Sequence, residues 1–270
     1  MIQPLHAVLL GLVEGVTEFL PVSSTGHLIL AANLLNLHGD AVNTFEVVIQ
    51  GGALVAVAGL YRARVASMWR GFLGQDAVGR RLCTNLVVSF LPAAIIGVLL
   101  HHVIKARLFN TGPVVAALMA GGVLMIGLDA RLRHQDHPSV GTLDSLTVGD
   151  ALLIGLAQCL SLWPGTSRAM VTIVAGLLLG FPATVAAEYS FLLALPTLGA
   201  ATAFEALTGG HVLLQGVSGV SMVCGFVTTA AVAALAIRGF IQYLTRRGLA
   251  PFGWYRVGLA AVFWMVTTHH

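Results

Sequence analysis

The hydrophobic pattern of the chain is dominated by long apolar segments that contain very few charges. Each is about as long as a helix must be to cross the ~30 Å hydrocarbon core of a membrane. The six segments that we expect to span are 43–61, 84–104, 112–131, 186–207, 212–238 and 253–268. The pattern therefore predicts an all-α polytopic membrane protein with six transmembrane helices.

Two further apolar stretches are interrupted before they reach spanning length. Residues 2–19 run into Leu20-Pro21 and then Ser23-Ser24-Thr25-Gly26, where proline and small polar residues end a helix. Residues 148–163, about 24 Å long as a helix, run into Trp163-Pro164-Gly165-Thr166-Ser167 in the same way. A short apolar run follows each interruption, so we predict two re-entrant helical hairpins.

The two interrupted stretches resemble each other in sequence. LLGLVEGVTEFLPVSSTGH (9–27) aligns with LIGLAQCLSLWPGTSR (153–168) when one gap is allowed. The aligned pairs are Gly11 and Gly155, Glu14 and Gln158, Phe19 and Trp163, Pro21 and Pro164, and Ser24 and Ser167. We therefore predict an internal duplication within a single membrane domain, 1–270, with repeat 1 at about 1–131 and repeat 2 at about 148–268.

The relative orientation of the repeats follows from the number of spans between them. Three predicted spans separate the hairpins of 1–36 and 148–180, so the hairpins enter from opposite faces and the repeat is inverted. Such folds place their site near the midplane, at the repeat interface. Arginines gather in the loops of one side (62–83, 131–147 and 239–252), whereas the other side has little beyond Lys105 and Arg107. By the positive-inside rule the first side is cytoplasmic, and the first hairpin opens outward.

Composition agrees with a membrane protein and narrows the classes of function. The 270 residues are 57% hydrophobic and 9% charged, against about 25% charged in a soluble domain, and the mean hydropathy is +0.89. The net charge of +3 is spread over loops, so we expect no nucleic-acid partner. The three cysteines have no paired spacing, which argues against disulfides or a zinc site. No Lys or Arg precedes Arg62, so we expect no cleaved secretory signal.

Costly polar residues gather at the tips of the predicted hairpins. Glu14 and Glu18 are four residues apart on one helix face, and carboxylates inside a membrane are expensive and usually functional. A close pair of carboxylates shares a proton, binds a cation or faces a cationic partner. Arg168 is the one Lys or Arg between Arg133 and Arg238. It suits bidentate binding of a phosphate or carboxylate, or alternatively an ion pair with Glu14 or Glu18.

Hydroxyl groups precede both short helices that follow the interruptions. Ser23-Ser24-Thr25 can cap exposed N–H groups, and the helix N-terminus that they border is a ready anion site. Thr166-Ser167 repeats the arrangement, and His27 lies one helical turn after Ser24, within reach of a serine hydroxyl or a bound phosphate. These groups suit phosphoryl transfer, which relies on positioning and charge stabilisation. The apolar surroundings indicate a phosphate carried on a lipid.

Three motifs carry a family resemblance. They are Glu14-x-x-x-Glu18 followed by Phe-Leu-Pro-Val-Ser-Ser-Thr-Gly-His27, then Pro164-Gly-Thr-Ser167-Arg168, and also Thr44-Phe-Glu-Val-Val-Ile-Gln50. The chain closely resembles the bacterial undecaprenyl-diphosphatase family of the bacitracin-resistance type along its whole length. The resemblance implies an inner-membrane enzyme that removes the terminal phosphate of undecaprenyl diphosphate, recycles the carrier lipid for peptidoglycan synthesis and opens its site outward.

The resemblance also implies roles for individual residues. The catalytic set is Glu14, Glu18, Ser24, His27 and Arg168, and the substrate-binding set is Ser23, Thr25, Gly26, Gly165, Thr166, Ser167 and Thr172. Our hypothesis is that Glu14 and Glu18 hold a divalent cation, Mg²⁺ or Ca²⁺, or tune His27. Ser24 then attacks phosphorus with His27 as base, or His27 activates water. The chain departs from the family at Ala169, where the second motif usually has serine.

Other classes of function remain as alternatives. A secondary transporter or lipid flippase shares the inverted-repeat design, although it needs no nucleophile beside a base. An intramembrane serine protease would leave Arg168 unexplained. An acid-phosphatase-like lipid phosphatase has a histidine soon after its arginine, whereas here none follows until His211. The sequence leaves open the nucleophile, the metal, the prenyl chain length and the oligomeric state, a homodimer included.

Overall fold

The computed structural model of the chain describes residues 2–108, 111–133 and 141–268, and it is helical apart from one isolated β-bridge between Ile2 and Val217. The helices are α1 (Pro4–Thr17), α2 (Ser24–Leu34), α3 (Asp40–Leu60), α4 (Arg62–Phe72), α5 (Ala77–Leu108), α6 (Thr111–Arg133), η1 (Leu143–Ser145), α7 (Val148–Gln158), η2 (Cys159–Leu162), α8 (Arg168–Leu178), α9 (Ala183–Gly216), α10 (Gly219–Arg247) and α11 (Ala250–Thr268). The predicted all-α class is confirmed. The side chains of Lys105 and Arg133, counted above for orientation, lie outside the described residues.

Five helices in the described part of the chain are long and apolar enough to cross a membrane: α3, α5, α6, α9 and α10. The protein is therefore a multi-pass membrane protein. The sixth predicted span forms α11, a helix of 19 residues that is not among these five. The interrupted stretches form the shorter apolar helices α1, α7 with η2, and α8.

Some helices extend beyond their predicted bounds. The sequence predicted that a span ends at 207, but α9 continues through Gly209-Gly210 to Gly216. A Cβ at Gly209 would come within 2.7 Å of Oγ1 of Thr44 on α3, so this glycine permits close packing of two helices rather than ending one. The segment 62–83, predicted as a loop, contains α4 and the start of α5.

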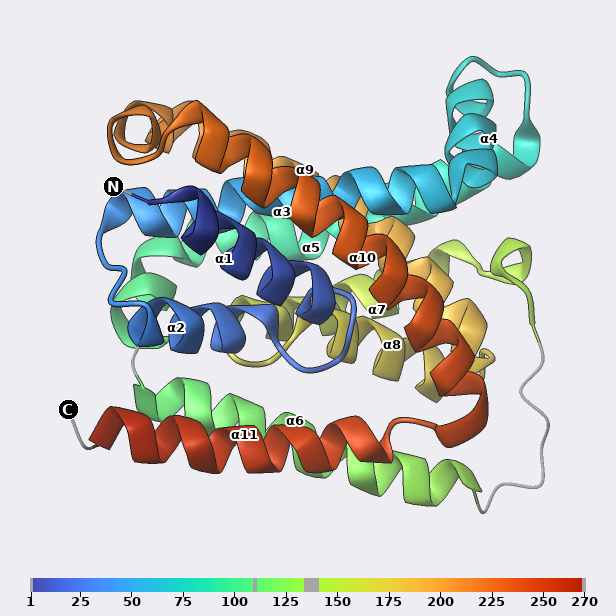
Figure 1. Cartoon of the computed structure of the whole chain (residues 1–270). Helices are drawn as coiled ribbons and strands as arrows, with labels where there is room; N and C mark the ends of the chain where they lie inside the picture. The colour runs from blue at the N-terminus through green and yellow to red at the C-terminus, as the bar shows by residue number, and fades with distance from the viewer. Residues whose placement is uncertain (1, 109–110, 134–140, 269–270) are drawn as a thin grey trace.

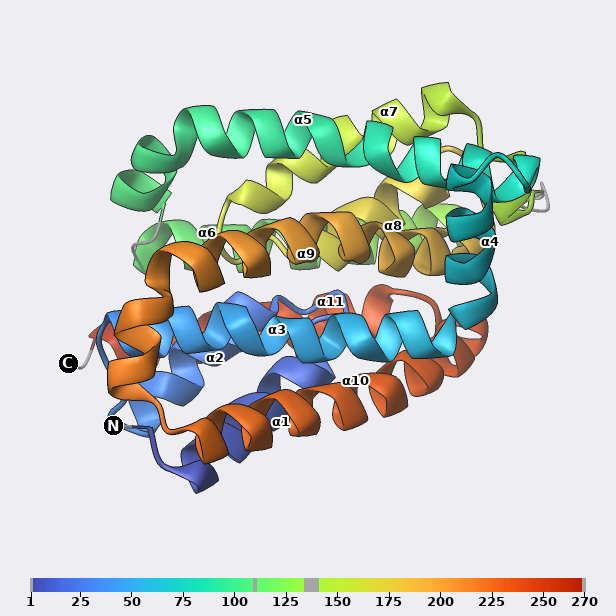
Figure 2. The same ribbon diagram turned by 90° about the horizontal axis from the view of Figure 1, so that it is seen from above.

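The short helices form two antiparallel pairs, α1 with α2 and α7 with α8 (Figure 1). The first helix of each pair packs along a long helix from the other half of the chain, α1 along α10 and α7 along α5. Figure 2 shows α3 and α9 side by side through the middle of the molecule, in agreement with their contacts. The helices α6 and α11 pair as a separate layer at the bottom of Figure 1.

Close approach of these helices depends on small residues at matching places. A Cβ at Gly11 of α1 would lie 2.7 Å from the carbonyl oxygen of Gly225 on α10. A Cβ at Gly155 of α7 would lie 2.6 Å from the carbonyl oxygen of Ser89 on α5. Small residues of this kind let backbones approach in membrane helix pairs. Gly11 and Gly155, aligned in the sequence, therefore serve the same contact in the two halves.

Aromatic packing fixes the connection between α1 and α2 inside the protein. Phe19 and Phe191 are both fully buried, and their rings meet edge to face with centroids 5.3 Å apart. Because Phe19 directly follows Glu18, the position of this carboxylate is set by a rigid hydrophobic contact with α9.

The turn between α4 and α5, outside the membrane-spanning segments, is held by Asp76. Oδ1 of Asp76 accepts hydrogen bonds from the backbone N–H groups of Val78 and Gly79, each at 3.0 Å. Oδ2 accepts the hydroxyl of Ser67 at 2.7 Å. These hydrogen bonds, the one from Gly79 foremost, hold the pKa of Asp76 below its usual value.

Acidification is therefore expected to loosen this turn. Because the pKa of Asp76 is depressed in the folded state, its carboxylate stabilises the turn above the ordinary pKa of 3.8, and that contribution is lost as the pH falls through the folded-state pKa. Hydrogen-exchange protection of the Val78 and Gly79 amides should fall below that pH in the wild type and be low at every pH in Asp76→Ala. Equal protection across the range in both proteins would contradict this role.

Candidate active site

The two hairpin turns share an unusual backbone conformation at the start of their second helices. Ser23 caps α2 with φ 74° and ψ 93°, and Ser167 caps α8 with φ 71° and ψ 114°. Positive φ is uncommon outside glycine, and such strained residues cluster at functional sites. Each serine hydroxyl accepts a hydrogen bond from the N–H three residues on, that of Gly26 or Met170. The two caps are therefore equivalent.

This equivalence corrects the predicted alignment by one residue. The sequence paired Ser24 with Ser167, whereas the structure pairs Ser23 with Ser167, because the cap follows Pro21 by two residues but follows Pro164 by three. Ser24 and Arg168 consequently occupy the same place, the first residue of each short helix.

Glu18 connects these two first residues across the hairpins. It follows α1 as the C-cap residue, and all three side chains are buried. Oε2 of Glu18 accepts the hydroxyl of Ser24 at 2.6 Å, and Oε1 accepts Nη2 of Arg168 at 3.0 Å. Hydrogen bonds to an ionised carboxylate are about twice as strong as neutral ones. The ion pair of Arg168 with Glu18, one of its two predicted roles, is present.

Arg168 is also held from the side of α9. Its Nη1 donates to the carbonyl of Ser190 at 2.8 Å, and the guanidinium carbon lies 5.9 Å from the centroid of the Phe19 ring. Nε of Arg168 is buried and has no hydrogen-bond partner among the described residues. The Nε–H of a rigidly held guanidinium is thus available to a ligand.

Glu14 is the buried carboxylate of the site that lacks a hydrogen-bond donor. It is 0% exposed, and neither of its oxygens has a hydrogen-bond partner in the part of the chain that the structure describes. It lies within electrostatic range of Glu18, Glu46 and Arg168. Because an uncompensated buried carboxylate is costly, Glu14 is the group of this site that is best placed to accept a cation or a proton.

His27 does not bond to Ser24. Nδ1 of His27 lies 2.7 Å from the carbonyl oxygen of Ser23, and since a carbonyl only accepts, Nδ1 carries a proton. Nε2 of the neutral ring then accepts the hydroxyl of Tyr255 at 2.7 Å, and the two rings are stacked with centroids 5.6 Å apart. Both nitrogens are occupied, so the predicted Ser24–His27 pair is not formed in this structure.

The remaining predicted binding residues all lie at the two tips. Thr25 and Gly26 belong to the first turn of α2, and Ser167 caps α8. Thr172 lies one turn into α8, where its hydroxyl donates to the carbonyl of Arg168 at 2.8 Å and shares a hydrogen bond with the hydroxyl of Ser190. Ala169 is fully buried in the hydrophobic core, so the missing hydroxyl falls in packed surroundings.

Arg256, which lies in a segment predicted as a membrane span, was not predicted as a site residue. Its side chain is 0% exposed, and within residues 2–108, 111–133 and 141–268 all of its hydrogen bonds go to backbone carbonyls. The acceptors are Pro21 at the first tip (3.4 Å), Gly165 (2.8 Å) and Thr166 (3.0 Å) at the second, and Ala117 (2.9 Å) and Leu118 (3.3 Å) on α6. A single arginine inside an apolar segment was the signal, because such a charge must find internal partners.

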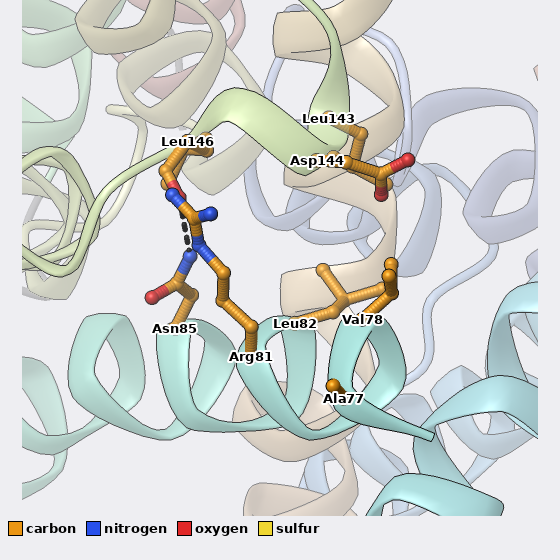
Figure 3. Close-up of a pocket in the computed structure, with 8 residues that line it drawn as sticks. All are labelled: Ala77, Val78, Arg81, Leu82, Asn85, Leu143, Asp144 and Leu146. Carbon is orange, nitrogen blue, oxygen red and sulfur yellow. Dashed lines mark hydrogen bonds between the residues drawn. The ribbon is translucent and has the colours of Figure 1, made fainter.

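A cavity of about 240 Å³ lies between the start of α5 and η1, apart from the residues of the site (Figure 3). Arg81 and Asn85 on its wall both donate to the carbonyl of Leu146, at 3.2 and 2.8 Å. No residue predicted for the site lines this cavity. Its polar contacts join α5 to the segment that leads into α7.

Comparison with known proteins assigns the chain to a family. Residues 7–262 match the family described as "Bacitracin resistance protein BacA". The chain belongs to this family. Similar proteins include an undecaprenyl-diphosphatase of Sorangium cellulosum, 51% identical over 96% of this chain and 85% of its own length. An undecaprenyl-diphosphatase of Methylococcus capsulatus is 43% identical over 98% and 95% of the two chains. The BacA match includes both hairpin tips and Arg256.

Proposed function

We propose that this protein hydrolyses undecaprenyl diphosphate to undecaprenyl phosphate and inorganic phosphate. Its relatives in the BacA family are named undecaprenyl-diphosphatases, after this activity. The observation that carries the proposal is the buried bridge from Ser24 through Glu18 to Arg168. It sets a hydroxyl, an acceptor for its proton and a guanidinium side by side inside an apolar protein, which suits phosphoryl transfer. The reaction recycles the carrier lipid for peptidoglycan synthesis and confers resistance to bacitracin.

In the proposed reaction Ser24 is the nucleophile and Glu18 is its base. Oγ of Ser24 bonds to the terminal phosphorus, its proton moves to Oε2 of Glu18, and the bond to the bridging oxygen breaks to release undecaprenyl phosphate. The oxygen of a water molecule then bonds to the phosphorus of the phosphoserine, and the bond from phosphorus to Oγ of Ser24 breaks. Oγ takes back the proton from Oε2 of Glu18, and the protons of the water leave with the inorganic phosphate. The free N–H of Arg168 and the N-terminus of α2 stabilise the negative charge on phosphorus oxygens.

The residues of the site fit a divalent cation such as Mg²⁺ or Ca²⁺. Glu14 would hold it, because neither of its oxygens accepts a hydrogen bond from the residues that the structure describes, whereas each oxygen of Glu18 already accepts one. No group of three or more His, Cys, Asp or Glu side chains among the described residues could hold a metal ion alone. Phosphate oxygens and water would supply the other ligands, as is usual for Mg²⁺. A bound cation supplies charge neutralisation at the diphosphate.

The proposed membrane arrangement places α1–α2 and α7–α8 as re-entrant hairpins and α11 as a sixth span, in two inverted repeats. Three observations support it. The serine caps of α2 and α8 are equivalent, the glycine contacts of α1 and α7 match, and the first helix of each hairpin packs along a helix of the other half of the chain. In addition, α1 begins and α11 ends at the same end of the molecule (Figures 1 and 2). With the arginine-rich loops in the cytoplasm, the first hairpin opens to the outer face of the bacterial inner membrane.

Transport of the lipid is the second candidate function. Paired broken helices that meet near the midplane are a design of secondary transporters. The packing of each hairpin against a helix of the other half of the chain favours transport. A transporter or flippase would bind the diphosphate at Arg168 without needing the hydroxyl of Ser24 beside Glu18. Chemical turnover therefore separates the two functions.

The deciding experiment measures phosphate release from undecaprenyl diphosphate by detergent-purified protein, with and without a chelator. We expect Ser24→Ala and Arg168→Ala to lower the rate by at least about 10²–10³-fold, because each removes a group that acts on the transferring phosphoryl group. Ser161→Ala is the matched control, since the Ser161 hydroxyl donates locally, to the carbonyl of Gln158 at 2.7 Å. No release by the wild type under any metal condition would favour the transporter.

Trapping the intermediate tests the nucleophile itself. Rapid quenching followed by mass spectrometry is expected to find phosphate on Ser24. Absence of any phosphoenzyme in a single turnover would favour attack by water activated at His27, for which Nε2 must first release Tyr255.

A further inference from the structure

An apolar groove of about 780 Å³ opens beside the proposed active site. Its volume is within the range of about 300–1,000 Å³ that is typical of ligand pockets. The first wall comes from residues 16–22 at the tip of α1, the second from α10 between Val232 and Tyr243, and the third from Pro251 to Tyr255 at the start of α11. The groove therefore lies between the first hairpin and the last two helices.

The surface of this groove is mostly apolar, and two of its three lining residues with hydroxyl groups use those groups elsewhere; the third is Tyr243. The hydroxyl of Thr17 donates to the carbonyl of Val13 at 2.6 Å. The hydroxyl of Tyr255 bonds to Nε2 of His27, which leaves its ring in the wall. Because these hydroxyls are already bonded, the groove offers little to a polar ligand and much to an apolar chain.

The groove borders the site at the first hairpin tip and at Tyr255. Val22, which lines it, directly precedes the cap residue Ser23, and Ser24 follows at once. Tyr255 belongs to the groove through its ring and to the site through its hydroxyl on His27. A lipid whose phosphate reaches Ser24 and Arg168 thus has an apolar path for its chain beginning next to the headgroup.

We propose that this groove between α1, α10 and α11 binds the isoprenoid units nearest the diphosphate of the lipid substrate. The proposal rests on the phosphatase function proposed above. It assigns recognition of the lipid chain to residues distinct from those that bind phosphate, so chain recognition and phosphate chemistry can be changed separately.

Gly239 allows the groove to be filled without disturbing the fold. It lines the groove on α10, it is exposed, and a Cβ built there has no heavy atom within 4 Å. Gly239→Leu therefore places a side chain in the groove. Gly258→Leu on α11 is the matched control, because Gly258 is also exposed and free of neighbours within 4 Å but does not line the groove.

The kinetic test compares undecaprenyl diphosphate with methyl diphosphate, whose single carbon is too short to occupy the groove. We expect Gly239→Leu to lower kcat/KM for the long substrate by at least about 10-fold, a pocket effect of the size that small apolar changes cause. It should leave the short substrate within about twofold of wild type, and Gly258→Leu should change neither. Unchanged hydrolysis of the long substrate, or equal losses for both, would overturn the proposal.

A second measurement does not depend on hydrolysis, so it separates failure of the groove from failure of the phosphatase function. Wild-type protein is irradiated with undecaprenyl monophosphate that carries a photoreactive diazirine on its first isoprene unit, and adducts are mapped by mass spectrometry. We expect adducts within 232–243 and 251–255, lost in Gly239→Leu and kept in Gly258→Leu. Adducts confined to other helices would exclude this groove as the chain site, whatever the activity.

Discussion

Replacement of Arg256 by methionine is expected to abolish phosphate release and to lower the free energy of unfolding by about 3–5 kcal/mol, the scale of breaking a buried charged network. Methionine fills much of the same volume but donates no hydrogen bond. The carbonyls of Pro21, Gly165 and Thr166 would lose this donor inside the protein, and an unsatisfied buried acceptor costs about 1–3 kcal/mol. Both tips would then lose one of the contacts that join them, and the ion pair of Glu18 with Arg168 would remain.

Thermal unfolding in detergent and phosphate release measure the two effects of this substitution. Arg238→Met is the control, because Arg238 is exposed on α10 and the same change there removes no buried donor. Arg256→Lys keeps the positive charge and tests whether the arginine positions the two tips. The ammonium group of lysine has three donors and lacks the planar shape of a guanidinium, so it cannot reach all five carbonyls. We expect it to be folded but slow. A stable and fully active Arg256→Met protein would refute this role.

The substitution Glu18→Gln is expected to lower kcat for phosphate release by about 10²–10⁴-fold, the usual contribution of a general base. Glutamine keeps the shape of the side chain and can still accept the hydroxyl of Ser24, but it does not take up the proton. Arg168 keeps its bond to the carbonyl of Ser190 and loses its charged partner. Substrate binding should therefore change less than turnover.

Steady-state kinetics on folded protein measure this split between kcat and KM. Glu205→Gln is the control, because Glu205 is a carboxylate on α9 that accepts the hydroxyl of Thr44 at 2.8 Å, a partner on α3 rather than at either tip. A Glu18→Gln enzyme that turns over within about threefold of wild type would show that Glu18 is not the base.

The sequence by itself determined the membrane class, the two interrupted helix pairs and the concentration of polar groups at their tips. These features are local: apolar length sets the spans, and proline, glycine and serine end the short helices. The sequence also offered an ion pair with a carboxylate of the first hairpin as one of two roles for Arg168, because a charge inside the membrane needs a partner. It left open which carboxylate, and the structure selects Glu18, 150 residues away.

Only the tertiary structure decided how the polar groups pair. Ser24 bonds to Glu18 rather than to His27, His27 bonds to Tyr255 at a separation of 228 residues, and Arg256 joins both tips. The period and length of apolar segments do not encode these partners, because a hydrogen bond between helices depends on how closely and at what rotation the helices pack. The lengths of the two hairpin turns also matter. The turn after Pro21 is one residue shorter than the turn after Pro164, and this difference makes Ser23, and not Ser24, the cap of α2.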